Sequence, residues 1–381
     1  MALINKLSAI GDAIREKTGK EDLLTLDQMP EEIKGISGGG AEVEPIVIDS
    51  QASYACAGAV SSAYIDLFGD TITTQGLRYV DNMFYKNLSK KIPFDLNFDP
   101  TYSGIDMKNM FYYAENLKEL PKIIGASPSS LSYICCGCYN LREIPDDYFD
   151  SWDFSYMDKL TGTYTGICNY MFQYCYSLRK CPLGWLKYTN PSVYESGCCY
   201  SSLFSYCFVL DEVVDLPVVA IDTTPRTANI FHSTFVNCHR IKNFTFAKNE
   251  DGSPVSVKWK KQTIDLTQYV GYSSKSSSCI NYNSGITADK EVKDDATYQA
   301  LKNDPDWFST DIAYSRYNHD SAVATINSLP DTSAYLATAG GTNTIKFSGR
   351  AGSKTDGGAI NTLTEEEIAV ATNKGWTITL V

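Results

Sequence analysis

MFYYAENLKELP, residues 110–121, carries the pattern that decides the fold of this chain. An apolar pair opens the phrase. A small residue follows three positions after the second member of the pair, leucine follows six after it, and proline ten after it. The same phrase returns as ICCGCYNLREIP at residues 134–145 and as MFQYCYSLRKCP at residues 171–182, with cysteine at the small position. Spacing that several stretches of one chain share indicates an internal repeat.

Three less complete copies bring the repeat to six. They begin at Met83-Phe84, a contracted copy that ends at Leu88 and Pro93, at Leu203-Phe204, and at Thr234-Phe235. Successive copies start 27, 24, 37, 32 and 31 residues apart, so the loops between them vary in length. We expect the shared positions to form the repeat core, which comprises Phe84, Phe111, Leu117, Cys138, Leu141, Phe172, Cys175, Leu178, Phe204, Cys207, Phe235 and Cys238.

The spacing of three predicts that the phenylalanine, cysteine and leucine positions share one face of a single helical turn. So short a unit cannot bury that face alone, and stacking on its neighbours in a solenoid would bury it. Cysteine suits the middle position because it is a small, mostly buried hydrophobe.

The phrase resembles the MFxxCxxLxxLP unit of BspA-type leucine-rich repeats over roughly residues 80–250. The resemblance implies an α/β, irregular leucine-rich-repeat solenoid, and it implies ligand binding, since such arrays occur in cell-surface and adhesive proteins. This chain departs from the family in its tyrosine-rich inserts, Tyr133–Tyr139 and Tyr164–Tyr176.

Residues 1–36 predict a small helical module, joined to the body by a glycine-rich linker at residues 37–40. Leu3, Leu7, Ile10 and Ile14 form one apolar stripe of a helix, and a second short helix follows. The module could pack on the body as a helical hairpin. We favour a role in attachment or oligomerisation, because a piece of this size has too little core to be stable alone.

The same stretch, ALINKLSAIGDAIREKTGKEDLLTLDQMPEEIKGI at residues 2–36, resembles the leader of tail-associated and fibre proteins of phages that infect Gram-positive gut bacteria. The resemblance implies a virion protein that is assembled in the host cytoplasm and contacts other virion proteins through this leader. It also implies a homo-oligomer, since fibre proteins are usually trimers. It leaves tail and head positions both open.

Residues 41–253 are interpreted as the repeat array with its lead-in region, and residues 254–381 as a C-terminal region that closes the array. In the latter we expect a helix over Asp320–Leu329 and a strand over Thr342–Phe347. Thr364 and Glu367 predict a capping box before a last helix, which Gly375 ends. A strand is expected from residue 376 to residue 381.

Composition argues against several functions. The net charge is -12, which disfavours nucleic acids and anionic membrane surfaces as partners. No apolar run approaches the roughly 20 residues of a spanning helix, so membrane insertion is not expected. The start of the chain lacks the pattern of a secretory signal.

The sequence does not favour a catalytic or metal site. Cys135 and Cys138 have CxxC spacing, but the other pair, Cys198 and Cys199, is adjacent, which suits zinc poorly. A disulfide among Cys168, Cys175, Cys181, Cys198 and Cys199 stays open after release from the cell. There are three histidines and no GxSxG or HExxH motif. The acidic run Asp146, Asp147, Asp150 and Asp153 is the best place for a polysaccharide depolymerase. We expect no cofactor and no metal.

Tyrosine, with 26 residues, is unusually common and suits a recognition surface. About half of those in the array should be core. The candidate ligand contacts are Tyr133, Tyr139, Tyr164, Tyr170, Tyr174, Tyr176, Tyr200 and Tyr206. The sequence therefore predicts binding rather than catalysis, by a tail-fibre or tail-tip subunit that contacts a host surface glycan or protein. A head-attached fibre or decoration protein, a bacterial adhesin, and a virion depolymerase are the alternatives.

Overall fold

A computed structural model places part of the chain, and the description that follows is confined to that part. It covers residues 46–49, 60–159, 168–185, 201–207, 210, 212–218, 231–236, 238, 241, 243–266, 319–347 and 363–380. The predicted helical module and its linker, with Leu3, Leu7, Ile10 and Ile14, lie outside the described residues.

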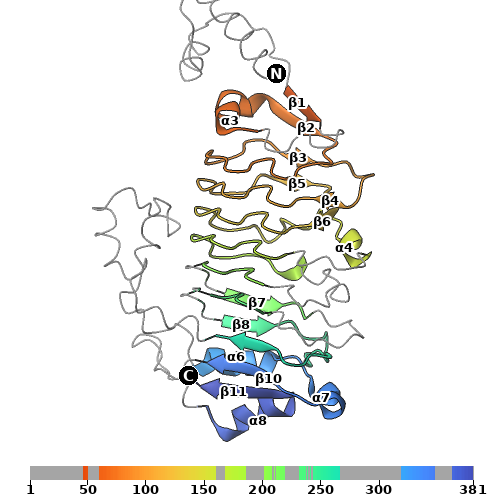
Figure 1. Cartoon of the computed structure of the whole chain (residues 1–381), viewed down its shortest axis with the longest axis vertical. Coiled ribbons are helices and arrows are strands. Elements are labelled where there is room, and N and C mark those ends of the chain that lie inside the picture. The colour runs from red at the N-terminus through yellow and green to blue at the C-terminus, as the bar shows by residue number, and fades with distance from the viewer. Residues whose placement is uncertain are drawn as a thin grey trace, which may run out of the picture.

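The described chain forms a stack of coils that runs from β1 at one end to β11 and α8 at the other (Figure 1). Every strand pair in it is parallel, as expected when each coil repeats the path of the one before. That the stack belongs to the leucine-rich class stays a prediction.

The first part of the stack has short strands on one side and turns on the other. Its elements are β1 (Ile46–Asp49), α3 (Ser62–Phe68), η1 (Gly69–Thr71), β2 (Ile72–Gln75), β3 (Leu96–Asn97), β4 (Ile105–Asp106), β5 (Ile123–Ile124), β6 (Pro128–Ser130) and α4 (Ser155–Lys159). The strand pairs are β1 with β2, β3 with β5, and β4 with β6.

The second part ends in a wider sheet covered by helices. Its elements are β7 (Glu212–Leu216), β8 (Asn243–Phe246), β9 (Thr263–Asp265), α6 (His319–Ser328), α7 (Ser333–Ala339), β10 (Asn343–Phe347), α8 (Glu365–Asn373) and β11 (Trp376–Leu380). β7 pairs with β8, and the closing sheet has the order β11-β10-β9.

The six repeat copies meet through a regular set of backbone hydrogen bonds. We call the second residue of each apolar pair the anchor; the anchors are Phe84, Phe111, Cys135, Phe172, Phe204 and Phe235. The amide of each of the first five anchors donates to the carbonyl of the residue before the next anchor, for example Phe84 to Met110 at 2.8 Å and Phe172 to Leu203 at 3.0 Å. Residues two before and two after the anchor donate to the next coil in the same way. Each of the five junctions between copies therefore carries three such bonds.

The prediction of a helical turn in each copy is wrong. The described residues of the copies form successive three-residue turns, in which only alternate amides bond within the coil, as Cys136 does to the carbonyl of Tyr133 at 3.1 Å. The amides between them point to the neighbouring coil. That alternation depends on left-handed residues two before and two after the anchors, with φ from 53° to 79°: Asn82, Lys86, Asn109, Tyr113, Tyr133, Gly137, Tyr170, Tyr174, Ser202, Tyr206 and Ser233. Such residues cannot continue a right-handed helix.

Each of the twelve residues predicted as repeat core is at most 3% exposed. Their rings pile up along the stack. Phe84 and Phe111 lie nearly parallel with centroids 5.3 Å apart, and Phe172, Phe204 and Phe235 continue with separations of 5.8 and 6.4 Å. Each buried phenylalanine contributes roughly 1.5–3 kcal/mol of hydrophobic stabilisation. The core is thus one column of side chains that runs through the coils.

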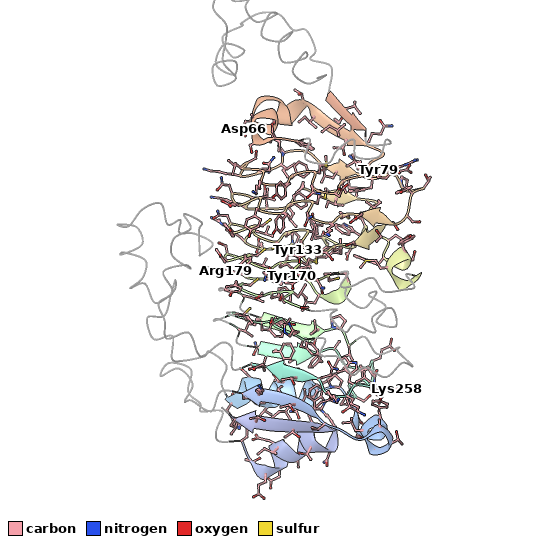
Figure 2. The ribbon with its side chains drawn as sticks, viewed as in Figure 1. Asp66, Tyr79, Tyr133, Tyr170, Arg179 and Lys258 are labelled. Atoms are coloured by element: carbon pink, nitrogen blue, oxygen red, sulfur yellow. The ribbon has the colours of Figure 1, made fainter. Side chains whose placement is uncertain are left out.

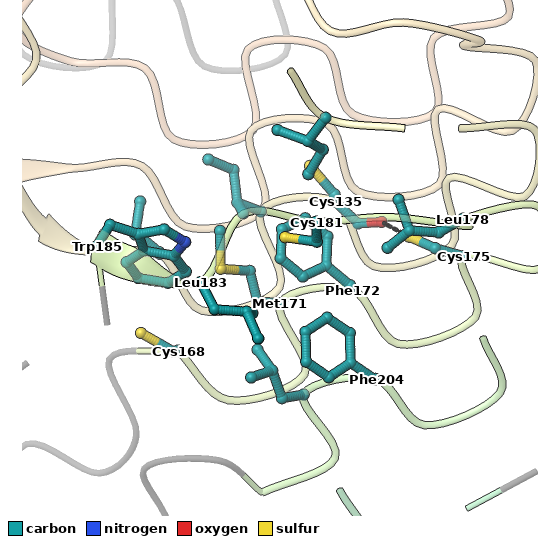
Figure 3. Packing of buried hydrophobic residues seen from close by; sticks show 14 of the residues in the cluster. Cys135, Cys168, Met171, Phe172, Cys175, Leu178, Cys181, Leu183, Trp185 and Phe204 are labelled. Atoms are coloured by element: carbon teal, nitrogen blue, oxygen red, sulfur yellow. Dashed lines mark hydrogen bonds between the residues drawn. The ribbon is translucent and has the colours of Figure 1, made fainter. Parts of the chain in front are cut away.

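The repeat cysteines do more than fill space. The thiol of Cys175 donates to the carbonyl of the anchor Cys135 at 3.1 Å, as Figure 3 shows. Cys138, Cys207 and Cys238 donate to the preceding anchors Phe111, Phe172 and Phe204 at 3.1, 3.1 and 2.9 Å. A thiol is a weak donor, and here it gives the anchor carbonyl a second partner without bringing a strongly polar group into the core.

The C-terminal predictions hold in outline. The helix predicted at Asp320–Leu329 is α6, and the capping box of Thr364 and Glu367 is formed at the start of α8. Gly375 has φ 82°, and a Cβ there would come within 2.5 Å of Thr332 Oγ1, so only glycine fits. The helix α7 was not predicted from the sequence.

The core is continuous across the boundary expected between residues 253 and 254. Phe246 and Trp259 lie on either side of it with ring centroids 6.4 Å apart. Trp259 in turn contacts Trp376, whose indole donates to the carbonyl of Pro330 at 2.8 Å. The array and the closing sheet therefore share one hydrophobic interior.

Candidate binding surface

Seven tyrosines of the repeat copies lie in successive coils, and we call them the tyrosine rim. Tyr85 is 42% exposed, and the other six are half-buried. All seven stand two before, one after or two after an anchor: Tyr85, Tyr112, Tyr113, Tyr133, Tyr170, Tyr174 and Tyr206. The same turns that carry the inter-coil hydrogen bonds therefore hold these rings at the surface.

Ring contacts join the rim across coils. Tyr85 stacks on Tyr112 at 5.7 Å, Tyr112 meets Tyr133 edge-on at 5.9 Å, and Tyr133 stacks on Tyr170 at 4.7 Å. Figure 2 labels Tyr133 and Tyr170 one above the other in the stack. On the neighbouring register, Tyr174 contacts Tyr206 at 4.8 Å.

Two predicted ligand contacts are wrong. Tyr139 and Tyr176 are only 3% and 5% exposed, and they stack on each other at 4.7 Å with an angle of 4° between the rings. They stand four residues after their anchors, where the chain has already turned inward. Both are buried next to rim residues: the ring of Tyr139 packs against that of Tyr113, and the ring of Tyr176 packs against that of Tyr174.

The predicted contacts Tyr133, Tyr170, Tyr174 and Tyr206 belong to the rim, whereas Tyr164 and Tyr200 lie outside the described residues. Three rim residues, Tyr85, Tyr112 and Tyr113, were not predicted from the sequence. Their position relative to the anchor was the available signal, because Tyr113 has the same offset from its anchor as Tyr174 and Tyr206.

Gly137 makes room for the rim in the third copy. It stands where the adjacent copies carry Tyr113 and Tyr174, and its φ is 79°. A Cβ on Gly137 would meet Cδ1 of Tyr113 at 2.8 Å, so the ring of Tyr113 rests directly on the glycine backbone. Any side chain there would push that ring outward.

The rim offers ring edges and hydroxyls more than ring faces. Tyr133 and Tyr170 are nearly parallel at 4.7 Å, so the faces that point along the stack cover one another. Burial raises the pKa of Tyr112 and Tyr133 and raises that of Tyr113 to about 12. The phenols are thus neutral at physiological pH and can each donate and accept a hydrogen bond. A sugar ring has no room to stack between these two rings.

The acidic run considered for a depolymerase lies at the surface, and some of its carboxylates already have partners. Asp146 forms an ion pair with Lys180 at 2.8 Å, and the carboxylate of Asp153 accepts the amide of Ser155 at 2.9 Å. All four carboxylates of the run are exposed. His319 Nε2 lies 3.2 Å from Glu367 Oε2 at the start of α8, so that histidine joins two helices.

The eight cysteines of the described segments are free thiols and are buried. Burial raises the pKa of Cys136 to about 12 and that of Cys135, Cys175 and Cys207 well above the usual range. Within the same segments, no group of three histidine, cysteine or acidic side chains is arranged to hold a metal ion. No helix found there is long and apolar enough to cross a bilayer.

No protein family model matches this chain, and neither the curated proteins nor the solved structures with which it was compared yielded a match. The rim, the stacked coils and the two sequence resemblances are therefore what bear on its function.

Proposed function

We propose that this chain is a structural subunit of a phage virion, of the tail-fibre or tail-tip kind, and that its tyrosine rim binds a host surface glycan or protein. Residues 1–36 would attach it to the particle and mediate its oligomerisation. The observation that carries the proposal is the rim itself, seven tyrosines that recur within two residues of the anchors in successive coils.

Two physical features favour binding at this surface. Tyrosine combines a large apolar ring with a hydroxyl, and it loses little conformational entropy on binding. Here the neighbouring rings and the inter-coil backbone hydrogen bonds already hold the tyrosine rings in place. Binding of a ligand would therefore cost less conformational entropy than binding to mobile side chains.

The chain itself supplies a conservative test of the rim. Ser202 and Ser233 occupy the register of Tyr133 and Tyr170, with φ 53° and 56°, so serine is compatible with this turn. We expect the full-length double variant Tyr133→Ser/Tyr170→Ser to bind Gram-positive gut isolates at least about tenfold more weakly than the unsubstituted protein, as loss of central aromatic contacts does.

Tyr335→Ser is the matched control, because Tyr335 is also half-buried but lies on α7, far along the chain from the rim. Equal loss in both variants, or none in either, would contradict a role for the rim. The virion assignment needs a separate measurement, which is labelling of purified particles with antibody against this chain. Particles without label would refute it, and the position of the label would separate tail from head.

A further inference from the structure

Four basic residues lie over one another along one edge of the stack. Lys118 donates its amide to the carbonyl of Lys90 at 3.1 Å, Arg142 to that of Lys118 at 3.3 Å, and Arg179 to that of Arg142 at 2.8 Å. These bonds place Lys90, Lys118, Arg142 and Arg179 at one register of four successive coils, and we call them the basic column. Figure 2 labels Arg179 at the edge of the stack, to the side of Tyr133 and Tyr170.

The next residue along each coil behaves differently. Lys91, Glu119, Glu143 and Lys180 follow the four members of the basic column in sequence. Lys91 pairs with Glu119 at 2.8 Å, and Lys180 pairs with Asp146 at 2.8 Å. That neighbouring register holds two lysines and two glutamates, and both of its lysines are paired.

Three of the four members of the basic column lack such neutralisation. Over the described part of the chain, Lys90, Arg142 and Arg179 form no ion pair, and each is exposed or half-buried. Adjacent coils joined by backbone hydrogen bonds are about 5 Å apart, so like charges recur at that interval. Such an arrangement is unfavourable by itself, and in a chain with net charge -12 it marks a local exception.

Repeated cations along an axis are complementary to repeated anions along the same axis. Arg142 and Arg179 stand nine residues after Tyr133 and Tyr170 in their respective coils, so the arginine and tyrosine registers advance together. A partner that combines hydroxyl groups with regularly spaced carboxylates matches both registers. Arginine suits the carboxylates, since its planar guanidinium can donate two parallel hydrogen bonds to one of them.

We propose that the basic column binds a linear acidic polysaccharide that runs along the stack, with carboxylates on Arg142 and Arg179 and with Lys90 extending the contact. The inference rests on the proposed function, because it names the class of ligand that the host-binding subunit would take. The polymer would lie along the long axis of the molecule and cross at least four coils.

The test uses full-length protein and polygalacturonate oligomers as the probe, with uncharged dextran for comparison. Binding is measured by calorimetry at about 50 mM and about 300 mM salt, because exposed charge pairs weaken as salt screens them. Arg142→Gln/Arg179→Gln should bind polygalacturonate on the order of tenfold more weakly and with a shallower salt dependence. Lys91→Gln/Lys180→Gln removes the same net charge from the neighbouring register, and its affinity should stay within about twofold.

Several outcomes would overturn the inference. They are no binding of polygalacturonate by the unsubstituted protein, equal binding of dextran, and equal losses in the two double variants. Inorganic polyphosphate that binds more tightly with the same arginine dependence would overturn the choice of polysaccharide. Thermal melts of both variants exclude unfolding as the cause. If polygalacturonate binding fails while Tyr133→Ser/Tyr170→Ser still weakens cell binding, this inference falls and the proposed function stands.

Discussion

The thiol of Cys175 donates a hydrogen bond to the main-chain carbonyl of Cys135, 3.1 Å away in the preceding coil. The relation recurs wherever a repeat copy has cysteine three residues after its anchor. It explains why the sequence uses cysteine at this position, because a larger side chain would crowd the buried column and a more polar one would need a stronger partner there.

Loss of one such thiol should destabilise the fold. Cys207 is fully buried, and Ala114 stands at the same register, so Cys207→Ala should leave the coil intact. The free energy of unfolding in urea should fall by about 1–2 kcal/mol, from a small cavity and a lost donor. Cys181→Ala is the control, because within the described part of the chain that buried thiol donates a hydrogen bond only to the carbonyl of the next residue, at a longer 3.4 Å. A larger loss for Cys181→Ala would argue against the inter-coil bond as a source of stability.

The same cysteines should resist alkylation in the folded protein. Burial raises the thiol pKa of Cys135, Cys175 and Cys207, so almost no thiolate is present at pH 8, and the thiolate is the reactive form. Iodoacetamide at pH 8, followed by peptide mass spectrometry, should leave these three unmodified until urea unfolds the chain. Rapid labelling without denaturant would contradict their burial.

Gly137→Ala and Gly252→Ala form a matched pair, since both glycines have φ 79°. Both substitutions incur the cost of a left-handed alanine, on the order of 1 kcal/mol. Only Gly137 has a ring in the way, with Cδ1 of Tyr113 at 2.8 Å, whereas nothing lies within 4 Å of a Cβ at Gly252. We expect Gly137→Ala to lower the melting temperature further and to weaken host binding, and equal effects would show that the contact with Tyr113 is unimportant.

Asp99 should stabilise the fold in a pH-dependent way. Hydrogen bonds from the hydroxyl and amide of Thr101, and then from Arg78, lower the pKa of Asp99 to about 2. A carboxyl whose pKa is depressed in the folded state adds stability above its unfolded pKa, about 4, and loses it as the pH falls toward 2. Asp99→Asn should therefore lower the melting temperature at pH 7, and the difference from the unsubstituted protein should shrink between pH 4 and pH 2. A constant difference over that range would contradict ionisation as its source.

What the sequence by itself determined is mostly local or tied to side-chain chemistry. The repeat phrase identified the buried positions, because phenylalanine, leucine and reduced cysteine are hydrophobic and are usually buried in a folded chain. Thr364, Glu367 and Gly375 predicted both ends of α8, because caps depend on atoms within a few residues. These predictions needed no knowledge of the neighbouring coil.

What only the tertiary structure decided are features that depend on contact between coils. The turns around Phe111 and Phe172 are not helical, because their alternate amides bond to the next coil and require left-handed residues beside the anchor. Tyr133 and Tyr139 are both tyrosines and stand only six positions apart, yet Tyr133 lies in the rim and Tyr139 is buried in the core. The basic column likewise joins residues 24 to 37 positions apart, Lys118 with Arg142 and Arg142 with Arg179. Composition and spacing carry no record of such distant neighbours, because the path of the chain alone brings them together.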